Sequence, residues 1–81
     1  MAKWVKFRRK LLSGQSDANI DFDELCRYIT RLGFVEHIEG SHHSFRMEGI
    51  PAIIVLQPAR DGNAKDYQVE QLREVIEEYG L

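Results

Sequence analysis

The 81-residue sequence contains little that would cross-link or anchor a chain. Cys26 is its single cysteine, so neither an intrachain disulfide nor a multi-cysteine metal site can form within it. The longest apolar run, residues 50–56, spans seven residues even with Pro51 counted, whereas a membrane-spanning helix needs about 18. No apolar stretch follows the basic N-terminal residues, so a secretory signal is not expected. These absences predict a cytoplasmic protein that does not enter a membrane.

Length and charge set further bounds on the class of protein. Eighty-one residues are enough for one domain, predicted here over residues 1–81. A 43% hydrophobic and 30% charged composition excludes a disordered or low-complexity chain. The net charge is −2, and five of the eleven basic residues lie between Lys3 and Lys10. A protein that binds nucleic acid through bulk charge is normally more basic, so any nucleic-acid function must depend on a local site.

Three stretches have the apolar spacing of helices, at residues 2–13, 22–32 and 67–79. Asp21 and Glu24 have the spacing of a capping box at the start of the second helix, and Asp66 is placed to cap the third. Gly33 suits the left-handed conformation that ends a helix. The residues expected to face the core are Trp4, Phe7 and Leu11 in the first helix, Phe22, Leu25, Ile29 and Leu32 in the second, and Val69, Leu72, Ile76 and Tyr79 in the third.

Between the second and third helices the sequence predicts three strands, at residues 34–39, 42–48 and 51–56. Gly40 and Ser41 suit a two-residue type II′ hairpin turn, in which glycine supplies the positive φ. Residues 51–56 are apolar on both faces, as expected for a buried strand. The predicted fold class is therefore α+β: an antiparallel three-stranded sheet covered on one face by the second and third helices and open on the other.

The middle strand places two adjacent histidines on opposite faces. Side chains alternate along a strand, so His43 shares a face with the apolar residues Phe45 and Met47 and should lie at the edge of the core, bonded to backbone. His42 and Arg46 then share the open face, with Ser44 between them. His37 lies in the first strand, where the pattern leaves its face undetermined.

An imidazole and a guanidinium on one open face are suited to phosphodiester chemistry. Imidazole exchanges a proton near neutral pH, and a guanidinium binds phosphate oxygens. The pair fits cleavage in which a ribose 2′-hydroxyl attacks its own phosphate, a reaction that needs no metal. Backbone N–H groups at Gly40 and Ser41 would add to phosphate binding if they point outward. His37, His42 and His43 lack the spacing of a metal site, and Cys26 is expected to be a buried, inert thiol, so no cofactor is expected.

Several of these residues also match a known family. The run Leu32-Gly33-Phe34, then Gly40-Ser41-His42-His43-Ser44-Phe45, then a buried strand and a helix ending Gly80-Leu81, resembles the HicA family, also described as YcfA-like. The resemblance covers residues 22–81, and its most specific part is the Gly-Ser-His element between two short strands. Helix 2–13 is an addition to this pattern, and residues 56–60 lack the histidine of the Val-Pro-x-His stretch that members often have.

The resemblance implies a fold like that of a double-stranded-RNA-binding domain. It also implies the toxin of a type II toxin–antitoxin pair, a ribonuclease that cleaves mRNA and is held inactive by a HicB-type antitoxin. The family's catalytic histidine falls on His42, and Gly40 and Ser41 form the turn that presents it. From the residues themselves we expect Arg46 to stabilise the charge of the phosphorane transition state, and the cations Lys6, Arg60 and Lys65 to guide RNA. The alternatives are a non-catalytic RNA-binding module or a protein-interaction domain on the same fold.

Overall fold

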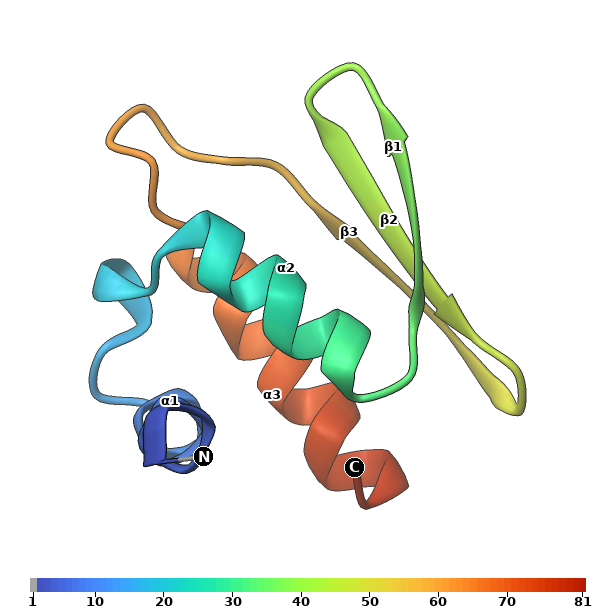
Figure 1. The fold of residues 1–81 in the computed structure, drawn as a ribbon, viewed down its shortest axis with the longest axis horizontal. Coiled ribbons are helices and arrows are strands. Elements are labelled where there is room, and N and C mark those ends of the chain that lie inside the picture. Colours follow the sequence, from blue (N-terminus) through green and yellow to red (C-terminus); the bar gives the residue numbers. More distant parts are fainter. Residues whose placement is uncertain (1) are drawn as a thin grey trace.

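The computed structural model describes residues 2–81, with the backbone alone for Ala2. The chain forms α-helices and an antiparallel sheet in the predicted order (Figure 1). The elements are α1 (Ala2–Ser13), a short 3-10 helix η1 (Asp17–Asn19), α2 (Phe22–Arg31), β1 (Val35–Glu39), β2 (His42–Met47), β3 (Ile50–Leu56) and α3 (Asp66–Tyr79). This confirms the α+β class. Among residues 2–81, no helix has the length and apolar character needed to cross a membrane.

Helix α2 begins at the predicted residue, Phe22, and ends one residue earlier than predicted, at Arg31, with Leu32 as its C-cap. The Oδ2 atom of Asp21 accepts a hydrogen bond from the Glu24 N–H at 3.0 Å, which satisfies one free donor of the first turn. The Glu24 carboxylate lies 3.7 Å from Lys3 Nζ, an ion pair that takes the place of the second half of a capping box. At the other end Gly33 has a φ of 111°. The Phe34 N–H donates to the Ile29 carbonyl at 3.4 Å, as in a Schellman stop.

Helix α3 begins at Asp66, one residue earlier than the predicted start at residue 67. Lys65 is the N-cap, with an extended backbone, and Asp66 is the first helical residue. The Oδ1 atom of Asp66 accepts a hydrogen bond from the Tyr67 N–H at 2.7 Å. The prediction that Asp66 caps this helix is therefore wrong. Its backbone already has the helical conformation, and its carboxylate accepts a hydrogen bond as part of the first helical turn.

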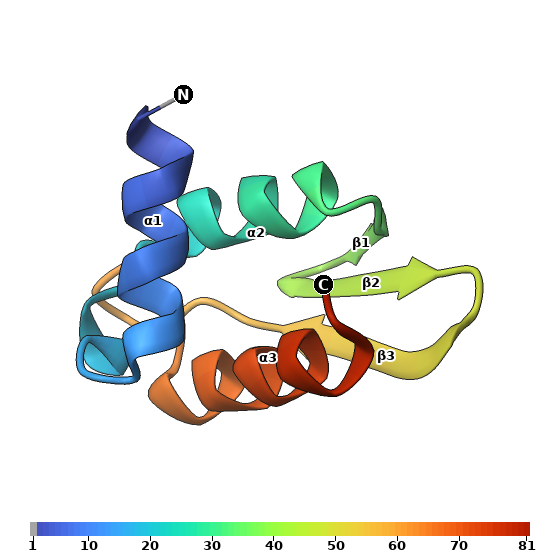
Figure 2. The same cartoon turned by 90° about the horizontal axis from the view of Figure 1, so that it is seen from below.

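The sheet has the order β1-β2-β3, and both pairs are antiparallel. Gly40 has a φ of 63° and joins β1 to β2 through the predicted two-residue turn, so that Glu39 lies opposite His42. Helices α2 and α3 both lie on one face of the sheet (Figures 1 and 2). Phe45, Ile54 and Leu56 point toward these helices and are buried in the core.

The second face of the sheet has no layer over it among the described residues. Ile53 and Val55 are each 45% exposed there, so the prediction that β3 is buried on both faces is wrong. Apolar composition indicates burial only where a further layer is present, and the helices supply one layer. The uncovered surface is called the open face below. It carries alternate residues of all three strands.

Helix α1 packs against the helical layer, away from the strands (Figure 2). Trp4 and Phe7 meet Tyr28 of α2, with ring centroids 6.0 and 5.3 Å from the tyrosine ring. Arg73 of α3 donates to the Leu11 carbonyl at 3.2 Å and to both carboxylate oxygens of Asp17, at 2.9 and 3.0 Å. One guanidinium therefore fastens α1 and η1 to α3.

Candidate functional site

The open face carries a shallow depression at the hairpin end of β1 and β2. Four residues line it: His37, Glu39, His42 and Ser44. The register explains their proximity, because His37 lies opposite Ser44 and Glu39 lies opposite His42, and cross-strand partners share a face. The depression has a volume of about 290 Å³. His42 is exposed at the first position of β2, on the face where strand alternation placed it.

His37 is a further functional candidate, although the sequence pattern did not determine on which face of the sheet it lies. Its side chain is 73% exposed, and its Nε2 atom lies 3.8 Å from Glu39 Oε2. His37 and His42 are diagonal neighbours across the strand pair, a placement that sets such residues about 7–8 Å apart. A two-residue turn at Gly40-Ser41 already implies this register, so the face of His37 could have been predicted from the sequence. The open face thus presents two imidazoles side by side.

Hydrogen bonds around the turn hold this end of the sheet in place. The Ser41 hydroxyl accepts a bond from Gln57 Nε2 at 3.3 Å, which connects the β1–β2 turn to the segment after β3. The Ser44 hydroxyl donates to the His37 carbonyl at 3.3 Å. Both contacts restrict the strands that carry the two imidazoles.

Arg46 is exposed on the same face but farther along β2. Arg46 lies four positions after His42 along the strand, a backbone distance of about 13 Å at the usual rise. A guanidinium at that distance is suited to a neighbouring phosphate of an extended strand, rather than to the phosphate that His42 reaches.

The remaining predicted cations lie on different parts of the surface. The segment 57–65 leaves β3 at the same end of the sheet as the β1–β2 turn (Figure 1). Arg60 is exposed within this segment, and Lys65 is half-buried at the start of α3. Lys6 is exposed on α1, beyond the helical layer, and the fold does not bring it to His42 (Figure 2).

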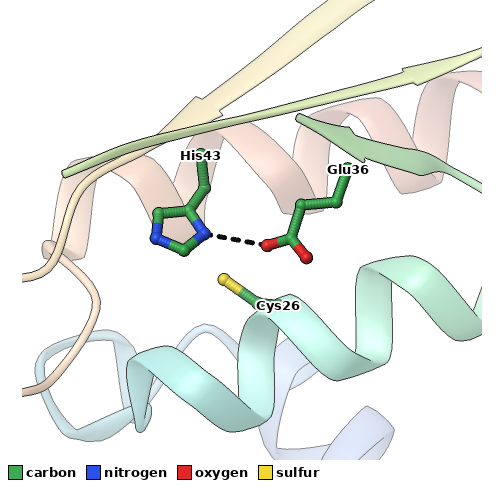
Figure 3. Close-up of side chains that lie close together, drawn as sticks. All are labelled: Cys26, Glu36 and His43. Atoms are coloured by element: carbon green, nitrogen blue, oxygen red, sulfur yellow. Dashed lines mark hydrogen bonds and ion pairs between the residues drawn. The ribbon is translucent and has the colours of Figure 1, made fainter. Parts of the chain in front are cut away.

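His43 faces the opposite way and belongs to a second cluster, beneath α2. Its Nδ1 atom lies 2.8 Å from Glu36 Oε2 (Figure 3). Its ring and the Phe22 ring pack edge-on, with their centroids 4.9 Å apart. The expectation that His43 bonds to backbone is therefore wrong. Strand pairing uses the backbone groups, and Glu36 is the diagonal neighbour of His43 on this face, so its carboxylate is the nearer acceptor.

Cys26 of α2 completes this second cluster (Figure 3). The thiol is buried, as predicted. Burial raises its pKa to about 12, and the carboxylates of Glu36, Asp23 and Asp21 add to the rise. A thiol that stays protonated at neutral pH is a poor nucleophile, in agreement with the inert role expected for it.

Since His37 and His42 lie on one face and His43 on the other, the three histidines cannot share one metal ion. Comparison with known proteins adds no assignment: no protein-family model, curated protein or solved structure matches the chain. The function must therefore be inferred from the chemistry of the open face and the motif that carries it.

Proposed function

We propose that this protein is a metal-independent endoribonuclease of the HicA type, the toxin of a type II toxin–antitoxin pair, which cleaves mRNA in the cytoplasm. The observation that carries the proposal is the position of His42. It follows the Gly40-Ser41 turn and is exposed on the face of the sheet that no helix within residues 2–81 covers. Strand alternation and the Gly-Ser-His resemblance point independently to this residue. The order of α2, three strands and α3 agrees with a double-stranded-RNA-binding-domain-like core.

The proposed reaction is transfer of the phosphoryl group to the neighbouring ribose hydroxyl. One imidazole takes the proton of the 2′-hydroxyl as its oxygen bonds to phosphorus. The bond from phosphorus to the 5′-oxygen breaks, and that oxygen receives a proton from a second acid. The products are a 2′,3′-cyclic phosphate and a free 5′-hydroxyl, so atoms and protons balance without a metal ion.

His37 and His42 suit the two proton-transfer roles. The attacking and leaving oxygens lie on opposite sides of phosphorus in an in-line displacement, so the two proton carriers must flank it. Diagonal neighbours about 7–8 Å apart leave room for one phosphate between their rings. We assign proton transfer at the reacting phosphate to His42 together with His37. Arg46 holds a neighbouring phosphate, and Arg60 is exposed on the segment 57–65 that follows β3.

The open face also supports a protein partner. Val35, Ile53 and Val55 are large apolar side chains that stay exposed on it. Exposed apolar residues grouped on one face are typical of a surface that another protein covers. A HicB-type antitoxin on this face would bury these residues and block His42 in one step.

The test is cleavage of RNA by the purified chain in the presence of a chelator. We expect the His42→Ala variant to lose at least about 100-fold in rate, since positioned acid–base groups contribute 10² to 10⁴. Gln71→Ala, at an exposed position of α3, is the matched control and should cleave as the wild type does. An RNA with a 2′-deoxy sugar at the cleaved position should resist.

Equal cleavage by the wild type and His42→Ala would contradict the proposed mechanism. Binding of RNA that persists in the variant, with no cleavage by either protein, would instead identify a non-catalytic RNA-binding module. Toxicity on induced expression that His42→Ala abolishes would support the assignment as a toxin. Growth arrest by the variant as well would contradict it.

A further inference from the structure

The cluster under α2 combines three metal-binding side chains from three separate elements. Cys26 comes from α2, Glu36 from β1 and His43 from β2, and all three point toward a common centre (Figure 3). One ligand atom from each lies within 4.8 Å of the others. We propose that Cys26, Glu36 and His43 form a Zn²⁺ site that joins α2 to the β1–β2 hairpin.

The chemistry of the donor atoms favours zinc. A thiolate, an imidazole nitrogen and a carboxylate oxygen are the ligand types that Zn²⁺ takes in proteins, at about 2.0–2.3 Å. A tetrahedral ion at those bond lengths holds its ligand atoms about 3.4–3.6 Å apart. The present spacing of up to 4.8 Å needs only a small contraction, within reach of side-chain rotation. Calcium and magnesium prefer oxygen ligands alone and fit this set poorly.

Zinc would take the place of a proton in this cluster. Nδ1 of His43 and Oε2 of Glu36 now share one across 2.8 Å. With the ion between them, Nδ1 binds the metal, the imidazole proton moves to Nε2, and the two atoms separate by about 0.6 Å to reach tetrahedral spacing. The Cys26 thiol gives up its proton to solvent as the sulfur binds.

The surroundings of the cluster favour a cation and leave room for it. A cavity of about 500 Å³ adjoins the three residues, so a water molecule can fill the fourth position. Asp23 also lines this cavity and adds negative charge, while the cation Arg27 is exposed and free to turn to solvent. Phe22 packs edge-on against the His43 ring at 4.9 Å and fixes its orientation. A ligand held in position loses less conformational freedom on binding.

This site is separate from the proposed ribonuclease site. His42 and His43 are adjacent in the chain, but they lie on opposite faces of the sheet. A zinc ion under α2 would strengthen the attachment of the hairpin to the helical layer and would not contact RNA on the open face.

The experiment titrates the chelator-treated full chain with Zn²⁺ in a calorimeter, and with Co²⁺ in an absorption spectrometer. We expect one ion per chain and a thiolate-to-cobalt charge-transfer band in the near ultraviolet. Cys26→Ala should abolish the band, and Glu36→Gln should weaken zinc binding at least about 100-fold, since the loss of even an indirect partner costs 10- to 100-fold. His42→Ala is the matched control, because it removes an imidazole from the other face and should leave zinc affinity unchanged.

Circular dichroism of each variant separates loss of the site from loss of the fold. Folded Cys26→Ala or Glu36→Gln protein with wild-type zinc affinity would overturn the proposal. So would the absence of stoichiometric binding to the wild type, or a loss of binding in His42→Ala. The two proposals fail separately, because RNA cleavage is measured in chelator and zinc binding is measured without RNA.

Discussion

The guanidinium of Arg73 connects α1 and η1 to α3 through hydrogen bonds, and its contribution can be tested by a conservative substitution. Arg73 and Asp17 have side chains only 16% and 17% exposed, and the fork of Arg73 meets both carboxylate oxygens. Its hydrogen bond to Asp17 raises the pKa of Arg73 above its usual value. Arg73→Lys keeps the positive charge but replaces the planar fork with a point charge that cannot hold the same contacts.

The expected loss can be estimated from the contacts. Hydrogen bonds to charged groups contribute about 1.5–3 kcal/mol each, and at this low exposure solvent screens them little. Lysine retains part of the attraction, so Arg73→Lys should cost about 2 kcal/mol. A chain of this length has a free energy of unfolding of roughly 4–12 kcal/mol. The midpoint of thermal unfolding should therefore fall by roughly 8–16 °C.

The assay is thermal unfolding followed by far-ultraviolet circular dichroism, with Asp17→Asn and the double variant completing a mutant cycle. A coupling energy of about 1–2 kcal/mol is expected between the two positions. Arg9→Lys, at an exposed position of α1, is the control and should stay within about 0.5 kcal/mol of the wild type. A midpoint for Arg73→Lys equal to that of the control, or strictly additive effects in the cycle, would refute the reasoning.

Three further predictions follow from the placement of single residues. His37→Ala should lower the rate of RNA cleavage at least about 10²-fold, and a rate equal to that of the wild type would remove His37 from the mechanism. Arg46→Ala should raise KM for RNA several-fold with little change in kcat, whereas Lys6→Ala, beyond the helical layer, should leave both unchanged; measured KM values that reverse this order would contradict the placement of RNA on the open face. Folded protein at pH 8 should react with iodoacetamide at Cys26 roughly 10³-fold more slowly than unfolded protein, because the pKa of the thiol rises from 9.0 to about 12 on folding. For the same reason, the contribution of this thiol to the free energy of unfolding is complete below pH 9 and is lost as the pH rises toward 12. Equal alkylation rates at pH 8, or unfolding that does not become easier above pH 9, would contradict the burial of Cys26.

Local sequence patterns were sufficient to predict the three α-helices and the three strands, but not the 3-10 helix η1. The Asp21 cap and the Gly33 stop bound α2, and the Gly40 turn fixes the pairing of β1 with β2. Each is a short-range signal with a steric or hydrogen-bonding cause, so it survives without knowledge of the tertiary structure. The exposure of His42 follows from the same logic, because alternation from the buried Phe45 decides its face.

The features that sequence reasoning missed depend on how elements meet. Ile53 and Val55 look like buried residues, and only the absence of a second layer over β3 among the described residues exposes them. The contact between His43 and Glu36 can be predicted only when β1 and β2 are first aligned across the turn, residue by residue. The approach of Cys26 to that pair depends on where α2 docks on the hairpin, and no pattern within either segment encodes that.

The length of the β1–β2 turn determines which face of the sheet each of the two adjacent histidines occupies. His42 and His43 share a peptide bond and face opposite sides, so a single inserted residue ahead of them would exchange their environments. The surface imidazole would then lie beneath α2, and the other would take the place of Ser44, opposite His37 on the open face. The length of this one loop is therefore under a double constraint.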